Sequence, residues 1–510
     1  MRSGVRLRSA GRIATVAALF AAIAMPVFAD KADDTLRFAF QQTLDHADPY
    51  FNTLVIGGIV ADEVWDGLIY RDPETGELRG NLATAWRWLD DRTLELDLRQ
   101  GVRFHNGAQF DADDVVYSVN FVANPDNKIA NPIVFRWVER AEKVDEHRVR
   151  IIAREPFPSA LAYLASSFFV IHPHEYYASV GPQGVNERPV GTGPYRVTEH
   201  ALGKYLRLER NPVYYTGGPK KAAQIEHVEI RFVPDAQTRV AEVVTGGIDL
   251  IMNVSRDQAE QLRGRVGLQV LVGGSTAIAY LQLNTREGSP VPALRDVRVR
   301  QALIHAIDRD TLVRYLLGDA AEVLHVPCHP SQFGCDANAA RRYDYNPALA
   351  RQLLAEAGYA RGFTLEISSD RDRGETEAIM GYLRAVGIDA GLRFMATAAR
   401  VTALRANRSA ASYGAIASSI DVSATLSRHF RFSADDTNRD AEVRDLLVRA
   451  DTSMDPAVRS AAYSAALALI TERAYMVLLY AAPTYYVAGS ELAFDPSADG
   501  RPRFYEMAWR

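Results

Sequence analysis

Histidines and carboxylates form the part of this sequence that looks most like a catalytic or metal site. His172, His174 and Glu175 stand together in the segment HPHE, which superficially resembles a metalloprotease motif. In that motif a second histidine follows the first by four positions, because both imidazoles must lie on one face of a helix. The residue four positions after His174 is Ala178. The segment therefore does not predict a zinc protease.

A second group of acids, Asp111 and Asp113, precedes an apolar run that begins at Val115. Such a pair could act as metal ligands or as a catalytic pair, but an aspartate before a helix also accepts hydrogen bonds from its free backbone N–H groups. We favour this capping role. The sequence has no G-x-S-x-G, S-x-x-K, H-E-x-x-H or P-loop motif. We therefore predict a protein that is not an enzyme and that uses no metal or cofactor.

The N-terminal segment has the pattern of an export signal. Four arginines precede or enter an apolar run over residues 13–28, and Val27-Phe28-Ala29 is a small-x-small cleavage pattern before Asp30. The alternative, a membrane anchor, needs about 20 apolar residues, and this run is shorter and contains Pro26. We predict a signal peptide over residues 1–29 and export to the periplasm. With no cysteine near the cleavage point, a lipoprotein is not indicated.

The only two cysteines, Cys328 and Cys335, lie in the loop VPCHPSQFGC. In an oxidising compartment, two cysteines this close in a loop rich in Pro and Gly favour a local disulfide. A metal site with His325 and His329 is the alternative, but zinc sites commonly use closer pairs such as C-x2-C. We predict the disulfide.

Composition and patterning indicate an α/β protein. The chain has 510 residues, 48% of them hydrophobic and 24% charged, and a formal net charge of −5. These values allow a sizeable core and give no electrostatic footprint for nucleic acid. Segments with strand and helix periodicity alternate along nearly the whole chain. In one such segment, Tyr280, Gln282 and Asn284 share one face of a strand, and helices capped by Asp308 and ended by Gly318 follow it.

Several motifs in order resemble the family 5 extracellular solute-binding proteins, the dipeptide- and oligopeptide-binding components of ABC importers. They are LATAWRWLDDRTLELDLRQGVRFHNGAQFDADDVVYS, VGTGPYRV, RNPVYY, LQLNT followed by RDVRVRQALIHAIDRDTL, and YDYNPALARQLLAEAGY. The resemblance implies an α/β fold of the periplasmic-binding-protein type (type II, large cluster), with a ligand cleft between two lobes. It implies a first lobe of residues 30–70, 191–285 and 485–510, an inserted subdomain of residues 71–190, and a second lobe of residues 286–484. The chain would cross between lobes near 285–290 and near 481–484.

The resemblance also implies a function. A protein of this kind captures a peptide or peptide-like solute between its lobes and delivers it to the permease subunits of an ABC transporter in the inner membrane. It would act as a monomer. Two alternatives stay open on sequence alone: a secreted hydrolase, for which no recognised nucleophile and base are present, and a periplasmic sensor with the same fold.

Candidate ligand residues follow from matching positions. In peptide-binding relatives, an acid in the second lobe pairs with the ligand's amino terminus, within a pattern that often reads G-W-x-x-D-x-x-D-P. The stretch matching it here is Gly414–Val422, in which Ser418 replaces that acid, Ser419 follows it, and Asp421 retains the second one. A hydroxyl cannot balance a buried ammonium. Binding of a free dipeptide therefore requires that Asp421 or another acid take over the role.

Relatives that bind dipeptides also use an arginine to hold the ligand's carboxylate, and Arg371 and Arg373 occupy the matching stretch. A guanidinium suits a carboxylate because it can donate two parallel hydrogen bonds. Alternatively, these arginines pair with nearby acids on a solvated loop. A retained arginine with a lost acid predicts an anionic ligand without a free amine. Gln41 and Gln42, after the first strand, and Asn284 are further candidates for the cleft.

Overall fold

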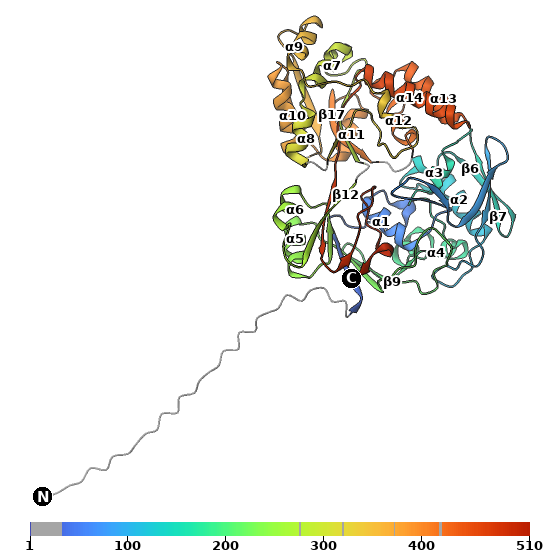
Figure 1. Ribbon diagram of the computed structural model, residues 1–510. Coiled ribbons are helices and arrows are strands. Elements are labelled where there is room, and N and C mark those ends of the chain that lie inside the picture. The colour runs from blue at the N-terminus through green and yellow to red at the C-terminus, as the bar shows by residue number, and fades with distance from the viewer. Residues whose placement is uncertain (2–32, 275–276, 319–320, 372, 418–420) are drawn as a thin grey trace.

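The computed structural model describes residue 1 and residues 33–274, 277–318, 321–371, 373–417 and 421–510. It is a two-lobed α/β structure in which each lobe is built around one large mixed sheet (Figure 1). The expected signal peptide lies outside the described residues. Among the described helices, none has the length and apolar character needed to cross a membrane.

The first lobe contains a sheet of order β12-β19-β11-β1-β10-β9-β8. Its strands are β1 (Thr35–Phe40), β8 (Tyr195–Ala201), β9 (Tyr205–Arg210), β10 (His227–Phe232), β11 (Leu250–Met252), β12 (Leu268–Gly273) and β19 (Thr484–Gly489). Strand β1 pairs in parallel with both β10 and β11. Phe38 and Phe40 point into the main core of this lobe, and Ala39 points to the opposite face. The lobe's helices are α1 (Val55–Val64), α5 (Ala236–Thr245) and α6 (Arg256–Leu262).

A smaller antiparallel sheet of order β4-β5-β7-β6 lies beside the first lobe. Its strands are β4 (Ala83–Trp88), β5 (Thr93–Leu98), β6 (Val138–Asp145) and β7 (Arg148–Ala153). The short hairpin of β2 (Ile69–Arg71) and β3 (Leu78–Gly80) leads into it. Helices α2 (Ala112–Ala123), α3 (Ala160–Leu164) and α4 (His174–Glu187) accompany it. Its buried residues share one continuous hydrophobic core with the first lobe, so the two pack as one unit.

The second lobe contains a sheet of order β14-β18-β13-β17-β15-β16. Its strands are β13 (Ala277–Leu283), β14 (Glu322–Val323), β15 (Thr364–Ser369), β16 (Asp389–Phe394), β17 (Ala411–Ala417) and β18 (Met476–Ala481). Separate hydrophobic clusters cover its two faces. Its helices are α7 (Val297–Ala306), α8 (Arg309–Leu317), α9 (Pro347–Glu356), α10 (Arg373–Ala385), α11 (Thr397–Arg405), α12 (Ser423–Phe430), α13 (Ala441–Thr452) and α14 (Pro456–Glu472). The short strands β20 (Leu492–Ala493) and β21 (Ala508–Trp509) pair near the C-terminus.

The position of β13 corrects one expectation from the sequence. This strand was expected to end the first lobe, with the chain crossing over at 285–290. Instead β13 pairs with β17 and β18 in the second sheet, so the first crossing lies between Gly273 and Ala277. The physical reason is that β13 is buried on both faces, as a strand inside a sheet is, and alternation alone does not say to which sheet a strand belongs. The chain passes between the two sheets a second time between β18 and β19.

Local signals in the sequence were more reliable than this boundary. The carboxylate of Asp308 caps α8 by accepting a hydrogen bond from Thr311 N, and the amide oxygen of Asn346 caps α9 by accepting one from Leu349 N. Cys328 and Cys335 form a disulfide with a Cα–Cα distance of 5.7 Å. This disulfide removes both thiols from the alternative metal site.

Candidate functional site

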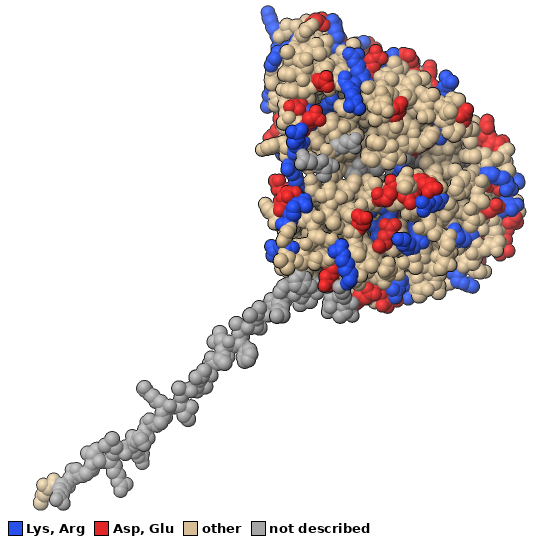
Figure 2. Space-filling view, in the orientation of Figure 1, with Lys and Arg blue, Asp and Glu red and all other residues tan. Residues whose placement is uncertain are grey.

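The two large sheets lie one in each lobe, and the lobes meet across the middle of the molecule (Figures 1 and 2). In the second lobe β15 and β17 are parallel, so the residues that follow both strands lie at the same end of the sheet, called the edge below. β13 starts from the first crossing beside the end of β17, because Ala277 pairs with Ala417. In the first lobe, β1 and β12 run the same way, and β12 leads into that crossing. The carboxyl ends of both sets of strands therefore line the junction between the lobes, where ligands bind in open α/β sheets.

Arg371 follows β15 at this edge. Its backbone N–H donates to Ser369 Oγ at 3.0 Å, which fixes the start of the loop. Its Nε is buried and has no hydrogen-bond partner among the described residues, and no described carboxylate lies within ion-pair distance of its guanidinium. Burial acts to lower the pKa of Arg371, but the neighbouring Tyr480 and Glu375 outweigh burial and raise it. The edge thus presents a charged guanidinium with unused donor capacity.

Arg373 differs from Arg371 although it is only two positions away. It is the first residue of α10, it is exposed, and its guanidinium carbon lies 4.5 Å from the centre of the Phe394 ring. Phe394 ends β16, the outermost strand of the sheet and the one farthest in the strand order from β18. Arg373 is therefore placed on the outside of this edge, whereas Arg371 is half-buried.

Asp421 follows β17, but its carboxylate is already occupied. It is 3% exposed, it forms an ion pair of 2.9 Å with Arg459 of α14, and it accepts from Ser423 N at 2.9 Å. It also accepts hydrogen bonds from the hydroxyls of Ser423 and Ser159. Ser159 immediately precedes the small helix α3 beside the first lobe, so this cluster bridges the inserted segment and the second lobe. Ser418 and Ser419 lie outside the described residues.

The remaining sequence candidates have different environments. Gln41 is at the end of β1, and its Oε1 is buried without a hydrogen-bond partner; Gln42 is exposed. Asn284 is fully buried, and its amide nitrogen donates to Asn407 Oδ1 and to the Ser409 carbonyl, each at 2.8 Å. Its Oδ1 accepts two hydrogen bonds from Arg286. Asn284 therefore holds the loop between α11 and β17 in place, and Gln41 is the better candidate for a ligand contact.

Sequence reasoning missed Ser159, Arg459 and Arg71. Arg71, at the end of β2, donates from Nη2 to the carbonyl of Ser331 in the second lobe at 3.1 Å. The guanidinium of Arg459 lies 4.6 Å from the Phe333 ring and donates to both Ser159 and Asp421. These contacts join segments that are distant in the chain, and no local pattern in the sequence marks them.

The one group of described residues with metal-like spacing is Asp111, Asp114 and His174. A capping box accounts for it: Asp111 and Asp114 accept hydrogen bonds from the first turn of α2 and from the residue before it. Asp114 also accepts from the backbone N–H of His174 at 2.8 Å and contacts its Nδ1 at the same distance. These carboxylates are thus used in holding α2 to α4, as the sequence favoured for Asp111.

The chain is similar to known binding proteins along most of its length. The family model for bacterial extracellular solute-binding proteins, family 5 (middle region), matches residues 77–436. The glutathione-binding protein GsiB of Salmonella paratyphi A is 27% identical over 404 residues, covering 78% of this chain and 74% of that protein. Heme-binding protein A of Haemophilus influenzae is 27% identical over 358 residues, or 64% of each chain.

A solved structure supports the fold. HbpA2 from Haemophilus parasuis superposes with a TM-score of 0.80 at 24% identity, covering 93% of this chain and all of that one. At this identity the likeness establishes the two-lobed architecture. The match to the family model spans well over half of the sequence, from the first small sheet to the loop after α12. This chain belongs to the bacterial extracellular solute-binding proteins of family 5.

Proposed function

We propose that this protein captures a peptide-like solute that carries a carboxylate and lacks a free amine. The observation that carries the proposal is the guanidinium of Arg371, which is charged, half-buried at the lobe junction and without a carboxylate partner among the described residues. A carboxylate of the solute would supply the partner that the Arg371 guanidinium lacks, because an arginine–carboxylate pair combines opposite charges with two parallel hydrogen bonds. Gln41, from the first lobe, would contribute a second contact across the cleft.

The absence of an amine in the ligand follows from the state of Asp421. An ammonium taken out of water needs a charged partner. The carboxylate of Asp421 is balanced by Arg459, and the position of the family's amine-binding acid holds Ser418. Nearby, Asp370 is 3.1 Å from Arg400, and Glu375 accepts a hydrogen bond from Tyr413. These described acids are thus engaged with other side chains.

The same proposal includes the mode of action. Closure of the lobes about the crossings between β12 and β13 and between β18 and β19 would enclose the solute, with the backbone rotation confined to a few residues. We divide the chain into a first lobe of residues 33–70, 191–274 and 483–510, an insert of residues 71–190, and a second lobe of residues 277–482. The mature protein would be a periplasmic monomer, would catalyse no reaction, and would deliver its ligand to the permease of an ABC transporter.

Native mass spectrometry of the protein purified from the periplasm tests the ligand class. We expect a retained small molecule whose mass changes on carboxyl esterification and stays unchanged with an amine-acylating reagent. A retained ligand that is acylated at a primary amine would contradict the proposal.

A further inference from the structure

A small polar cavity lies within the first lobe, next to the contact that Arg71 makes with the second lobe. Its volume is about 50 Å³. Four cations, two carboxylates and a phenol line it: Arg71, Lys220, Arg501, Arg503, Asp62, Asp499 and Tyr505. A single water molecule needs roughly 10–15 Å³ by this measure. The cavity can therefore hold a few waters or one small polar group.

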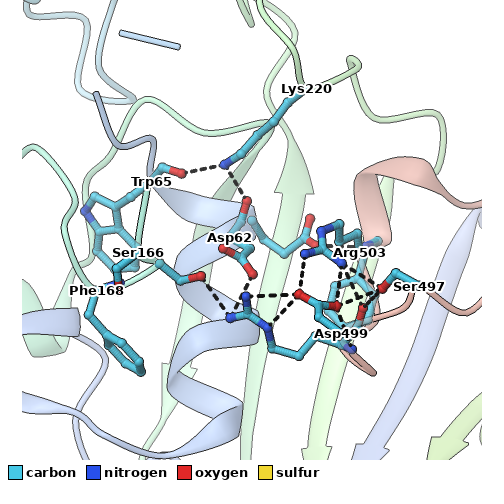
Figure 3. A network of polar contacts seen from close by, with 12 residues as sticks. Asp62, Trp65, Ser166, Phe168, Lys220, Ser497, Asp499 and Arg503 are labelled. Carbon is cyan, nitrogen blue, oxygen red and sulfur yellow. Dashed lines mark hydrogen bonds and ion pairs between the residues drawn. The ribbon is translucent and has the colours of Figure 1, made fainter. Parts of the chain in front are cut away.

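Lys220 has its own partners. Its ammonium forms an ion pair of 2.9 Å with Asp66 and donates to the carbonyls of Asp62 and Trp65 at 2.8 and 2.9 Å. Figure 3 shows it reaching down to these carbonyls at the end of α1. Its charge is balanced within the protein.

Arg501 and Arg503 are balanced as well. Asp499 lies 2.8 Å from Arg503 Nη2, and Figure 3 shows these two side chains facing each other. Arg501 Nη2 lies 3.3 Å from Asp499, and Arg501 Nη1 lies 3.2 Å from Asp62. Burial acts to raise the pKa of Asp499, but the two guanidinium groups outweigh burial and hold it far below its usual range. Gly58 of α1 allows this close approach, because a Cβ there would lie 2.9 Å from Arg501 Nη1.

Arg71 is the exception among these cations. No described carboxylate lies within ion-pair distance of it, and its hydrogen bond goes to the Ser331 carbonyl, a neutral acceptor. Burial lowers its pKa, which means that its charge is poorly solvated.

A second polar group with an unsatisfied hydrogen bond lies in the same wall of the cavity. Tyr505 is 1% exposed, and its hydroxyl lacks a well-formed hydrogen bond among the described residues, with the phenol of Tyr70 its polar neighbour in the same wall. A buried hydroxyl without a partner costs free energy unless something fills the site. An uncompensated cation and an unused O–H donor in one cavity match the needs of an oxyanion.

We infer that this cavity is an anion-binding position that takes one oxyanion group, such as a carboxylate or a sulfate-like anion, between Arg71 and Tyr505. It is separate from Arg371 and stands without the ligand proposed for the cleft. The anion closes the charge balance of the cavity, and Arg71 then couples its binding to the contact between the lobes through Ser331. The group comes either from a free anion or from a second acidic group of the solute.

Thermal melting with sodium sulfate at low millimolar concentration, against sodium chloride of equal ionic strength, tests the site. Sulfate is expected to raise Tm by about 2 °C or more in the wild type through ligand linkage, and to raise it less than half as much in Arg71→Gln and Tyr505→Phe. Arg71→Lys keeps the charge and should keep at least half of the shift. Arg351→Gln is the matched control, because Arg351 is also bonded to a single backbone carbonyl but is exposed on α9.

A second arm identifies the source of the anion. N-acetyl-Ala-Glu and N-acetyl-Ala-Gln are titrated into wild type and Arg71→Gln. If the group belongs to the solute, the substitution weakens binding of the first compound about tenfold and leaves the second unchanged. If it is a free anion, the sulfate shift depends on Arg71 and both peptides are unaffected. Equal responses of wild type and Arg71→Gln in both arms would overturn the inference, as would equal loss of the sulfate shift in Arg71→Lys.

Discussion

Arg371 and Asp421 stand at the ends of neighbouring parallel strands, yet only Asp421 has a counter-charge among the described residues. Asp421 is surrounded by donors: Arg459, Ser423 and Ser159 all contact its carboxylate. The guanidinium of Arg371 has no described carboxylate partner, and its Nε is buried without an acceptor. The carboxylate of Asp421 is buried and accepts several hydrogen bonds, whereas the half-buried guanidinium of Arg371 keeps a donor without an acceptor. A charged residue at a ligand edge is thus available only if its own protein has not already neutralised it.

The largest effect is expected at the occupied site. Asp421→Asn should lower the free energy of unfolding by about 3–5 kcal/mol, because it leaves the buried guanidinium of Arg459 without its counter-charge. Urea denaturation measures this change. The double variant Asp421→Asn/Arg459→Met removes both charges and should recover at least half of the loss. A loss below about 1 kcal/mol in the single variant would mean that Asp421 is not tied up and could serve a ligand amine.

At the free site, substitution should affect binding instead of stability. Arg371→Gln is expected to weaken binding of N-acetylated dipeptides about 100-fold, since a charge-assisted pair contributes roughly 1.5–3 kcal/mol. Isothermal titration gives the affinity. Arg373→Gln is the matched control, because Arg373 is exposed and stacks on Phe394, and it should bind as the wild type does. Equal losses in the two variants would remove the distinction between these arginines.

The stability of the protein should depend on pH in opposite ways for a buried acid whose pKa is raised and for one whose pKa is lowered by cationic partners. Glu63, in the first lobe, has a pKa raised from 4.5 to about 8, chiefly by burial. The folded form keeps its proton while the unfolded chain loses it, so stability is full below pH 4.5 and falls as pH rises to about 8. Glu63→Gln should flatten this part of the curve. Chemical denaturation at several pH values measures it, and an unchanged slope in the variant would contradict the assignment.

Asp435, in the second lobe, should act in the opposite direction. Burial acts to raise its pKa, but hydrogen bonds from Arg405 and Arg428 outweigh burial and lower the pKa from 3.8 to about 2. Its contribution to stability is therefore present above pH 3.8 and is lost as pH falls toward 2. Asp435→Asn should be less stable than the wild type at pH 6, and the difference should shrink near pH 2. A constant difference across this range would argue against an ionic role.

The smallest effect concerns the bridge between the inserted segment and the second lobe. Ser159→Ala removes one hydroxyl from the Asp421 cluster while leaving the Arg459 ion pair in place, so we expect stability to fall by about 1 kcal/mol. The radius of gyration without ligand, from small-angle X-ray scattering, should rise if this contact favours closure. Ser179→Ala is a suitable control, because that exposed hydroxyl bonds only within α4. An unchanged radius would limit Ser159 to a local role.

The sequence predicted features whose cause is local. Asp308 and Asn346 cap their helices as expected, because a cap depends on the residues within one turn. The ordered motifs predicted the family and the two-lobed fold. The lobe boundary at β13 was wrong, because pairing with β17 and β18 depends on segments far along the chain.

The candidate site was harder to predict than the fold. The family pattern placed Arg371 and Asp421 at one edge of the sheet. It did not predict which residues contact them. Arg459 contacts Asp421 from 38 positions away in the sequence, and Ser159 contacts Asp421 from 262 positions away. Whether a charge is neutralised is decided by such contacts. The cavity at Arg71 is the clearest example, since residues of β2, of the loop at Lys220 and of the C-terminal segment meet there.

The most direct test of the account is the titration of one dipeptide in two forms, Ala-Glu with a free amino terminus and N-acetyl-Ala-Glu, into the wild-type protein at pH 7. Because Arg371 can receive a carboxylate and no described acid of the cleft is free to receive an ammonium, the acetylated form should bind at least tenfold more tightly. Tighter binding of the free dipeptide would contradict the central claim that this cleft recognises an anion without an amine.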